Sequence, residues 1–390
     1  MITVNEALDH LFSLVSPGPT EHVGLAHAAG RVLAGAVAAT HDQPPFAASA
    51  MDGYAVRSDT VKPGAVFNVI GESAAGHRFG GKAEIGQAVR IFTGAPMPEG
   101  TDQVVIQEDV IRDGDLITLS NNLGHGMNVR PAAADFRSGD TLKGPRILSA
   151  SDIALLAAMN VAQVPVARRP RVAVMATGDE LVMPGETPGP DQIIASNCFG
   201  LMALLENWGA SPQMLPIARD NIASLETAFD LASGADLIIT IGGASVGDHD
   251  LVGRVAEDLG MERAFYKIAM RPGKPLMAGR MGGAAMIGLP GNPVSAMVCG
   301  HVFLRPVIRA MLGLGATPTP RHTAHLSANV PSNGPREHYM RATVNADGIE
   351  TATRQDSALL SVLADANALL VRPAADGARS SGELVEYIPI

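Results

Sequence analysis

The segment DLIITIGGASVGDHD at residues 236–250 decides the fold class, because it joins an apolar run to a glycine-rich loop and then to a helical pattern. Two other apolar runs, residues 171–176 and 284–289, also end in glycine-containing loops that precede helical periodicity. This repeated order predicts an α/β domain with a mainly parallel sheet covered by helices. Such sheets bind ligands beyond the carboxyl ends of their strands, so the three loops are expected to form a site.

The segments on either side of this α/β domain, which we place at residues 169–318, have different patterns. Short β-type runs predict a C-terminal β domain over residues 319–390 and a β-rich module over residues 44–137. Amphipathic helical stretches precede and follow the module, each with a capping residue. We therefore expect a discontinuous helical domain, residues 1–43 plus 138–168, into which the β-rich module is inserted.

Composition excludes several classes of protein. Apolar residues make up 46% of the 390 and charged residues 17%, which is globular rather than disordered composition. The net charge of -10 argues against a general nucleic-acid binder. Cys198 and Cys299 are too few for a disulfide framework and fit a reduced compartment. The N-terminus lacks a signal peptide pattern, and no apolar run reaches the length of about 20 residues that spans a membrane, so we expect a cytoplasmic protein.

The glycine-rich loop after the middle strand has the features of a phosphate site. Its glycines let the backbone approach a ligand, and the helix that follows offers free N–H groups to an anion. A tight turn explains such a loop equally well when it is taken alone. Asp248 and Asp250 favour a site, because two carboxylates repel a phosphate unless a cation such as Mg²⁺ lies between them. The phosphate-binding candidates in this loop are Gly242, Gly243, Ser245 and Gly247.

The other two loops and a basic segment between them add further candidates. Glu180 follows the first strand, and with Asp248 and Asp250 it completes the proposed metal ligands. Turn and cap residues explain each loop alone, but convergence of three strand ends favours a site. Basic side chains are usually solvated, yet beside these loops they would neutralise phosphate or oxyanion charge. These further candidates are Pro290, Gly291, Asn292 and Pro293 in the third loop, and Lys267, Arg271 and Lys274 in the basic segment.

Six motifs occur in one order along the chain: SAMDGYAV at 49–56, TGAPMPEG at 93–100, TGDEL at 177–181, GGASVGD at 242–248, RPGKP at 271–275 and LPGNP at 289–293. Physical reasoning alone explains the first two motifs as turns rather than as parts of a site. As a set, the motifs resemble the MoeA family of molybdopterin molybdenumtransferases, which is related to the E domain of gephyrin. The resemblance implies four domains, with a C-terminal β-barrel, and an elongated homodimer. Its active site would join the α/β domain of one subunit to the inserted domain of the other.

The resemblance also implies a reaction and its residues. Adenylylated molybdopterin and molybdate are the implied substrates, Mg²⁺ the cofactor and AMP a product, with molybdopterin adenylyltransferase and molybdoenzymes as further partners. Two departures from the family pattern are Arg271, where Lys is common, and Ala133-Ala134 before Asp135, where Gly-Glu is common. The positions that match family activity residues are Asp52, Thr93, Glu180, Asp220, Lys267, Arg271, Pro290 and Pro293. Weaker matches are Asp135, Arg341, Ser357 and Ser361.

Two other functions remain open from the sequence. One is a scaffold protein, as in receptor-clustering relatives of gephyrin, which carry an additional domain and a long linker that this sequence does not show. The other is a nucleotide hydrolase on the same α/β domain, which lacks support because no Walker-type glycine motif occurs. AMP release that depends on molybdate would distinguish the enzyme from both.

Overall fold

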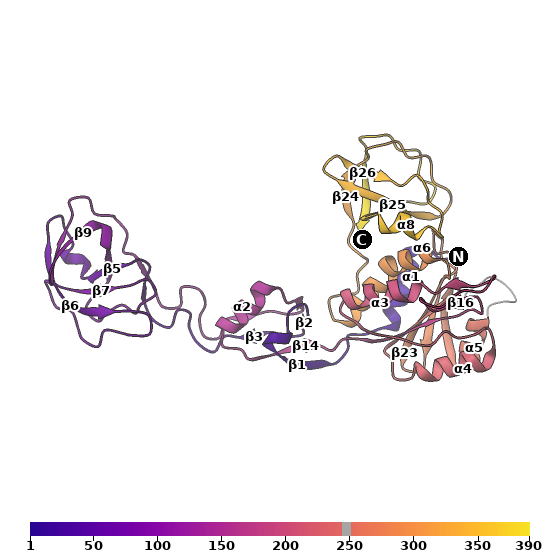
Figure 1. Cartoon of the computed structure of the whole chain (residues 1–390), viewed down its shortest axis with the longest axis horizontal. Coiled ribbons are helices and arrows are strands. Elements are labelled where there is room, and N and C mark those ends of the chain that lie inside the picture. The colour runs from indigo at the N-terminus through magenta and orange to yellow at the C-terminus, as the bar shows by residue number, and fades with distance from the viewer. Residues whose placement is uncertain (244–250) are drawn as a thin grey trace.

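The chain is elongated, and different parts of the sequence form its two ends. The computed structural model describes residues 1–243 and 251–390. In Figure 1 the inserted β module lies at one end, the α/β and C-terminal β domains lie at the other, and a small middle domain lies between them. The chain starts beside the α/β domain, runs through the middle domain to the inserted module, and returns by the same route.

The α/β domain contains the mainly parallel sheet that the apolar runs predict. Its strand order is β18-β15-β19-β23-β22-β20, in which β22 and β20 are antiparallel to their neighbours and the others are parallel. The three predicted runs form β15, β19 and β23, which are adjacent. The strands are β15 (Arg171–Ala176), β18 (Ser211–Met214), β19 (Leu237–Ile241), β20 (Met261–Tyr266), β22 (Met277–Met281) and β23 (Ala284–Leu289).

Helices bury both faces of this sheet. Val172 and Val174 of β15 pack in one core with α3, α6 and α7, whereas Ala173 and Met175 pack in a second core with α4 and α5. Successive side chains of a strand point to opposite faces, so a strand covered on both faces is apolar throughout. The helices are α3 (Asn197–Asn207), α4 (Ile222–Leu231), α5 (Leu251–Asp258), α6 (Pro293–Cys299) and α7 (Arg305–Met311).

One helical stretch, Pro293–Met311, is long and apolar enough to cross a membrane by length and composition. It consists of α6, a π-helical turn at Gly300–Leu304 and α7. The protein buries 83% of its most apolar window, so its position in the core of the α/β domain accounts for its apolarity.

The first helix, α1 (Val4–Leu14), forms where the capping box predicts it. Thr3 accepts the backbone N–H of Glu6, and the Glu6 carboxylate accepts the backbone N–H of Thr3. Its apolar face packs into the α/β core beside α7, β20 and β22. The prediction that this helix belongs with residues 138–168 in one helical domain is therefore wrong, because amphipathic spacing identifies a buried face without identifying the core that covers it.

The middle domain is discontinuous in sequence, as predicted, but it is mainly a sheet rather than a set of helices. Its strand order is β1-β14-β2-β13, with one α-helix, α2 (Ala150–Ala158), packed on it. The strands are β1 (Thr20–Gly24), β2 (Val32–Leu33), β13 (Arg146–Ile147) and β14 (Gln163–Ala167). The short strands β3 (Val37–Ala38) and β12 (Thr141–Leu142) pair beside it. Pairs that join residues before and after the insertion hold this domain together.

The inserted module is the β-rich unit that its sequence predicts. Its six-stranded sheet has the order β8-β5-β7-β6-β10-β9 around a core that contains Tyr54, Phe67 and Ile117. A Cβ on Gly53 would lie 2.0 Å from the Val105 carbonyl oxygen, so only glycine fits there. The strands are β5 (Gly53–Val56), β6 (Val66–Ser73), β7 (Gln87–Ile91), β8 (Gln103–Ile106), β9 (Val110–Asp113) and β10 (Leu116–Leu119). A separate pair consists of β4 (Ala48–Ser49) and β11 (Val129–Arg130).

The C-terminal β domain takes one strand from the α/β domain. β21 (Met270–Arg271) pairs with β25, and an isolated bridge between Leu326 and Ile349 connects the end of β24 to β26, so the sheet closes on itself. The path is β21-β25-β27-β28-β24, with β26 also paired to β25. Its elements are β24 (His322–His325), β25 (Glu337–Asn345), β26 (Gly348–Thr351), α8 (Leu360–Ala364), β27 (Ala368–Arg372) and β28 (Leu384–Pro389).

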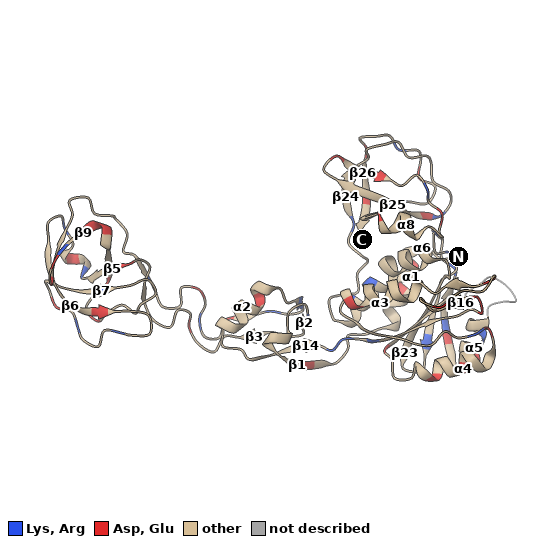
Figure 2. Cartoon of the chain, viewed as in Figure 1, with Lys and Arg blue, Asp and Glu red and all other residues tan. Residues whose placement is uncertain are grey.

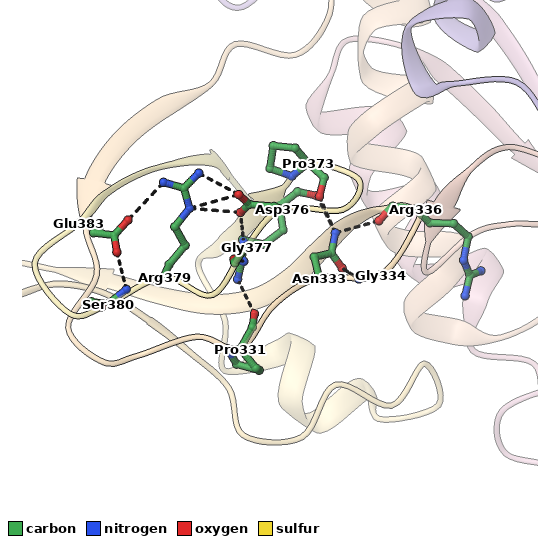
Figure 3. A network of polar contacts seen from close by, with 11 residues as sticks. Pro331, Asn333, Gly334, Arg336, Pro373, Asp376, Gly377, Arg379, Ser380 and Glu383 are labelled. Carbon is green, nitrogen blue, oxygen red and sulfur yellow. Dashed lines mark hydrogen bonds and ion pairs between the residues drawn. The ribbon is translucent and has the colours of Figure 1, made fainter.

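A buried arginine, Arg372, stabilises one edge of this domain by binding Asp376, which Figure 3 shows in contact with Arg379. Arg372 donates to the Asp376 carboxylate at 2.6 Å, to the Pro331 carbonyl at 3.1 Å and to the Gly377 carbonyl. Arg379 donates to the same carboxylate at 2.8 Å. Each nitrogen of the buried Arg372 guanidinium therefore has a partner, as a stable buried charge requires.

Candidate functional site

A cavity of about 650 Å³ opens at the carboxyl ends of β15, β19 and β23. It is lined by the three loops that follow these strands, as the parallel topology predicts. The predicted site residues that line it are Glu180, Asp220, Gly242, Gly243, Pro290, Gly291, Asn292 and Pro293. Ser245, Gly247, Asp248 and Asp250 lie outside the described residues.

Arg219 positions the acidic side of the cavity, and no motif identified it. Its Nη1 atom donates to the carbonyl oxygens of Asp179 at 3.1 Å and Leu181 at 3.2 Å. The backbone N–H of Asp220 donates to the Asp179 carboxylate at 3.2 Å. These bonds fix the loop that carries Glu180 against the loop that carries Asp220, so both carboxylates line the same cavity.

The first two residues of the glycine-rich loop must be glycines for steric reasons. Gly242 has φ 93°, and a Cβ there would lie 2.7 Å from the Thr177 carbonyl oxygen. Gly243 has φ 65°, and its Cβ would lie 2.1 Å from Val252 Cγ2. The absence of side chains leaves backbone at the cavity wall, where a ligand can approach it closely.

The third loop connects the cavity to the C-terminal β domain. Asn292 precedes α6, which has Pro293 in its first turn, and its Nδ2 atom donates to Ser357 Oγ at 3.2 Å. The backbone N–H of Val294 donates to the Ser357 carbonyl oxygen at 3.0 Å. Ala358 lines the cavity beside this contact. The C-terminal β domain therefore supplies part of the wall.

The basic segment lies beside the cavity rather than in its wall. Pro275 lines the cavity, but Lys267, Arg271 and Lys274 are not among the lining residues of the described chain. The Lys267 Nζ atom lies 4.8 Å from the centre of the Tyr266 ring, and Arg271 on β21 is in register with His338 on β25. The segment thus connects the cavity wall, at Pro275, to the C-terminal β domain, at β21.

Arg341 is a buried cation whose charge is only partly satisfied. Its side chain has no exposed surface, and its Nη2 atom donates to the carbonyl oxygens of Asp356 at 2.8 Å and Arg354 at 3.3 Å. Its Nε and Nη1 atoms, and His338 Nε2, have no hydrogen-bond partner among the described residues. Such atoms are rare in native proteins and call for an explanation.

The surroundings of these unpartnered nitrogen atoms are strongly positive. Burial, followed by the charges of Arg271 and Arg341, lowers the pKa of His338 to about 4. Burial and the charge of Arg271 also lower the pKa of Arg341, although Asp356 opposes the change. Because residues 354–358 join Arg341 to the cavity wall, an anion at this position would lie beside the cavity.

Asp52 and Thr93 form a hydrogen-bonded pair in the inserted module. The backbone N–H and the hydroxyl of Thr93 donate to Asp52 Oδ1 at 2.7 and 2.8 Å, and these bonds, with the charge of Arg90, lower the pKa of Asp52. Arg90 lies between the Tyr54 and Phe92 rings, 5.0 and 4.8 Å from their centres. It was not identified from the sequence.

The chain does not bring this pair to the cavity. Figure 1 shows β5 and β7, which adjoin Asp52 and Thr93, at the opposite end of the molecule from β16 (Leu181–Val182) at the cavity. Asp135 lies in the connection to the middle domain, where its N–H donates to Gln43. Ser361 is on α8 and does not line the cavity in the described chain.

The charges and carboxylates of the described residues limit what the chain can bind. Figure 2 shows acidic and basic residues on every part of the chain. No group of three or more His, Cys, Asp or Glu residues within the described ranges could hold a metal ion alone. Glu180 and Asp220 line one cavity, and carboxylate oxygens such as theirs are typical Mg²⁺ ligands. A bound ion would therefore need further oxygens, such as those of a phosphate.

Comparison with known proteins identifies the family. The MoeA N-terminal region (domains I and II) matches residues 2–160, a probable molybdopterin binding domain matches residues 173–310, and the MoeA C-terminal region (domain IV) matches residues 323–390. A molybdopterin molybdenumtransferase from Nostoc sp. is 38% identical over 100% of this chain and 94% of its own. One from Haemophilus influenzae is 36% identical over 100% and 98%.

A solved structure agrees with these matches. The molybdopterin biosynthesis MoeA protein from Pyrococcus horikoshii OT3 is similar with a TM-score of 0.86 and 26% identity, and the similarity covers 100% of both chains. The resemblance read from the six motifs is thereby confirmed along the whole sequence. This chain is therefore an enzyme of the MoeA family of molybdopterin molybdenumtransferases.

Proposed function

We propose that the chain inserts molybdate into adenylylated molybdopterin and releases AMP, leaving molybdenum on the pterin dithiolene. One observation carries this proposal: a cavity at the strand ends adjoins a buried, partly unpartnered cation, Arg341. The cavity volume of about 650 Å³ is within the usual range for small-molecule sites. A cofactor-sized substrate in the cavity and a separate oxyanion at Arg341 would thus occupy adjacent binding sites.

The chemistry assigns each substrate to a part of the site. Water adds to the phosphoanhydride between the pterin and adenylyl phosphates, and the bond to AMP breaks. The two dithiolene thiols replace two molybdate oxygens, which leave as two water molecules with the two thiol protons and two further protons from solvent, so no electrons are transferred. Gly242 and Gly243 offer close backbone contact to the phosphates, and the unpartnered guanidinium nitrogens of Arg341, beside the positive charge of Arg271, offer donors to molybdate.

Mg²⁺ fits this site through Glu180 and Asp220, with phosphate oxygens as the remaining ligands. The ion would neutralise phosphate charge and favour departure of AMP. Arg219 positions both loops, because it donates to carbonyl oxygens on one loop and is adjacent to Asp220 on the other. Asp248 and Asp250 are candidates for the same ion that lie outside the described residues.

The remote position of Asp52 supports a shared site in a homodimer. In this arrangement Asp52 of the partner subunit and Thr93 of the partner subunit face the cavity. Asp52→Ala and Glu180→Ala dimers are each expected to be folded and inactive. When the two variants are mixed under conditions that allow random subunit exchange, about one quarter of wild-type activity should return. Half of the dimers are then mixed, and one of the two sites in each mixed dimer carries neither substitution. If exchange is shown directly and no activity returns, the shared site is wrong.

The decisive experiment measures AMP release from adenylylated molybdopterin with and without molybdate. The proposal expects release that depends on molybdate and on Mg²⁺. A nucleotide hydrolase would release AMP in both conditions, and a scaffold would release it in neither. We further propose that the chain is cytoplasmic, receives its substrate from molybdopterin adenylyltransferase and supplies molybdoenzymes.

A further inference from the structure

A second pocket, of about 240 Å³, lies between the middle domain and the α/β domain. Arg169 precedes β15, and Gly209 precedes β18, so the pocket is at the amino-terminal edge of the sheet. The cavity described above is at the opposite, carboxyl-terminal edge. The two sites are therefore separated by the length of the strands.

The wall of this pocket has a strong excess of positive charge. Arg31, Arg169, Arg305 and Arg309 line it, and no Asp or Glu is found among its described lining residues. Arg31 is neutralised by an ion pair with Glu21. The other three guanidinium groups make no hydrogen bond or ion pair with any described residue. Three cations without a protein partner, of which Arg305 and Arg309 are half-buried and Arg169 is exposed, thus share a pocket of about 240 Å³.

Two of these cations repel each other. Arg305 and Arg309 are four residues apart on α7, where side chains lie on the same helix face and like charges destabilise the helix. Burial, with the charge of Arg309, lowers the pKa of Arg305. Both effects oppose the folded state, and the attraction of an anion bound between the two side chains would offset them.

We propose that this pocket binds a dianionic oxyanion, either free or as the phosphoryl group of a small phosphorylated molecule. Three guanidinium groups supply paired N–H donors of the geometry that phosphate and sulfate accept. The volume of about 240 Å³ is below the range of about 300–1,000 Å³ for drug-sized ligands, which favours a small group over a whole nucleotide. Leu312 and Leu314 form an apolar wall for a short carbon chain.

Trp208 gives this pocket its own reporter, because it lines the pocket and is the one tryptophan in the sequence. Its fluorescence is followed while full-length protein is titrated with sulfate, phosphate or glycerol 3-phosphate, with chloride used to hold ionic strength constant. We expect a saturable change in the wild type. Loss of two cations in Arg305→Gln/Arg309→Gln should weaken binding by at least about tenfold.

Matched controls separate this site from the cavity and from general charge effects. Arg341→Met removes the cation beside the cavity, and Arg112→Gln removes one from the inserted module, so both should titrate as the wild type does. Arg169→Gln, which does not alter α7, replaces the double variant if that variant fails to fold. Tighter binding of glycerol 3-phosphate than of sulfate identifies a phosphorylated molecule, and equal binding identifies a free oxyanion. No saturable change in the wild type, or an unchanged titration in the folded arginine variants, overturns the proposal.

Discussion

Two buried arginines can each be replaced by Met to test whether the guanidinium group serves mainly to bind a ligand or mainly to stabilise the fold. Arg372 is 1% exposed, and its nitrogens are bonded to Asp376, Pro331 and Gly377. Arg341 is fully buried, but its Nε and Nη1 atoms have no partner among the described residues. Arg372→Met and Arg341→Met therefore make the same change in one domain, but the first removes a fully hydrogen-bonded guanidinium and the second removes one with two unpartnered nitrogens.

The expected stabilities differ by several kcal/mol. Arg372→Met leaves Asp376 without one of its partners, and breaking a buried ion pair costs about 3–5 kcal/mol. Arg341→Met loses two charged hydrogen bonds, each worth about 1.5–3 kcal/mol, but it also removes two buried unpaired donors, each costing about 1–3 kcal/mol. The central values of these two effects differ by only about 0.5 kcal/mol. The Arg341 variant should therefore remain nearly as stable as the wild type.

Two measurements test this contrast. Hydrogen exchange of β25 and β27 amides under mild urea reports the local stability of the C-terminal β domain. Molybdate-dependent AMP release reports the site, and we expect it to be lost in Arg341→Met. Saturating molybdate at about 100 times its Kd should stabilise the wild type by about 2.7 kcal/mol and leave Arg341→Met unchanged. A loss of about 3 kcal/mol or more in Arg341→Met, or retained molybdate dependence, would refute the assignment.

Three further substitutions test other parts of the molecule, by AMP release or by urea unfolding. Glu180→Gln keeps the shape of the side chain and removes its charge, so AMP release should lose its Mg²⁺ dependence, and an unchanged dependence removes Glu180 from the site. Gly243→Ala adds a clash with Val252 to a positive φ and should lose about 2–4 kcal/mol, whereas Gly64→Ala, with a similar φ and open space, should lose only about 1–2 kcal/mol in urea unfolding. Hydrogen bonds from Arg379 and Arg372 lower the pKa of Asp376 from 3.8, so its stabilisation is present above pH 3.8 and is lost as pH falls through the lower folded value. In Asp376→Asn the urea midpoint should no longer show this fall as the pH is lowered. If the fall persists, another group causes it.

The sheet and the cavity could be predicted because their signals are local. Each of β15, β19 and β23 is a continuous apolar run, since both faces of the sheet are buried, and each ends in a loop. Parallel strands bring their carboxyl ends to one edge, so loops far apart in sequence, such as those of Glu180 and Asn292, meet without any local signal between them.

The features that escaped prediction depend on contacts between distant segments. The apolar face of α1 was evident, but nothing in its sequence indicated that β20 and β22 would cover it. The residues around Arg219 in the sequence form no motif. Arg219 positions the cavity loops because it donates to the carbonyl oxygens of residues about 40 positions earlier. The burial of Arg341 likewise arises only when β25 pairs with β27 and residues 354–358 fold over it.

The middle domain explains how a remote pair could serve a site on another chain. Both connections to the inserted module pass through this domain, where β2 pairs with β14 and β13. Two paired connections resist bending and twisting more than one flexible linker would, so we expect them to limit how far the module moves relative to its own α/β domain. The proposed shared site needs such an arm, because positioning of catalytic groups tolerates errors of only about 1 Å. The short strands of the middle domain would then contribute to catalysis without contacting the substrate.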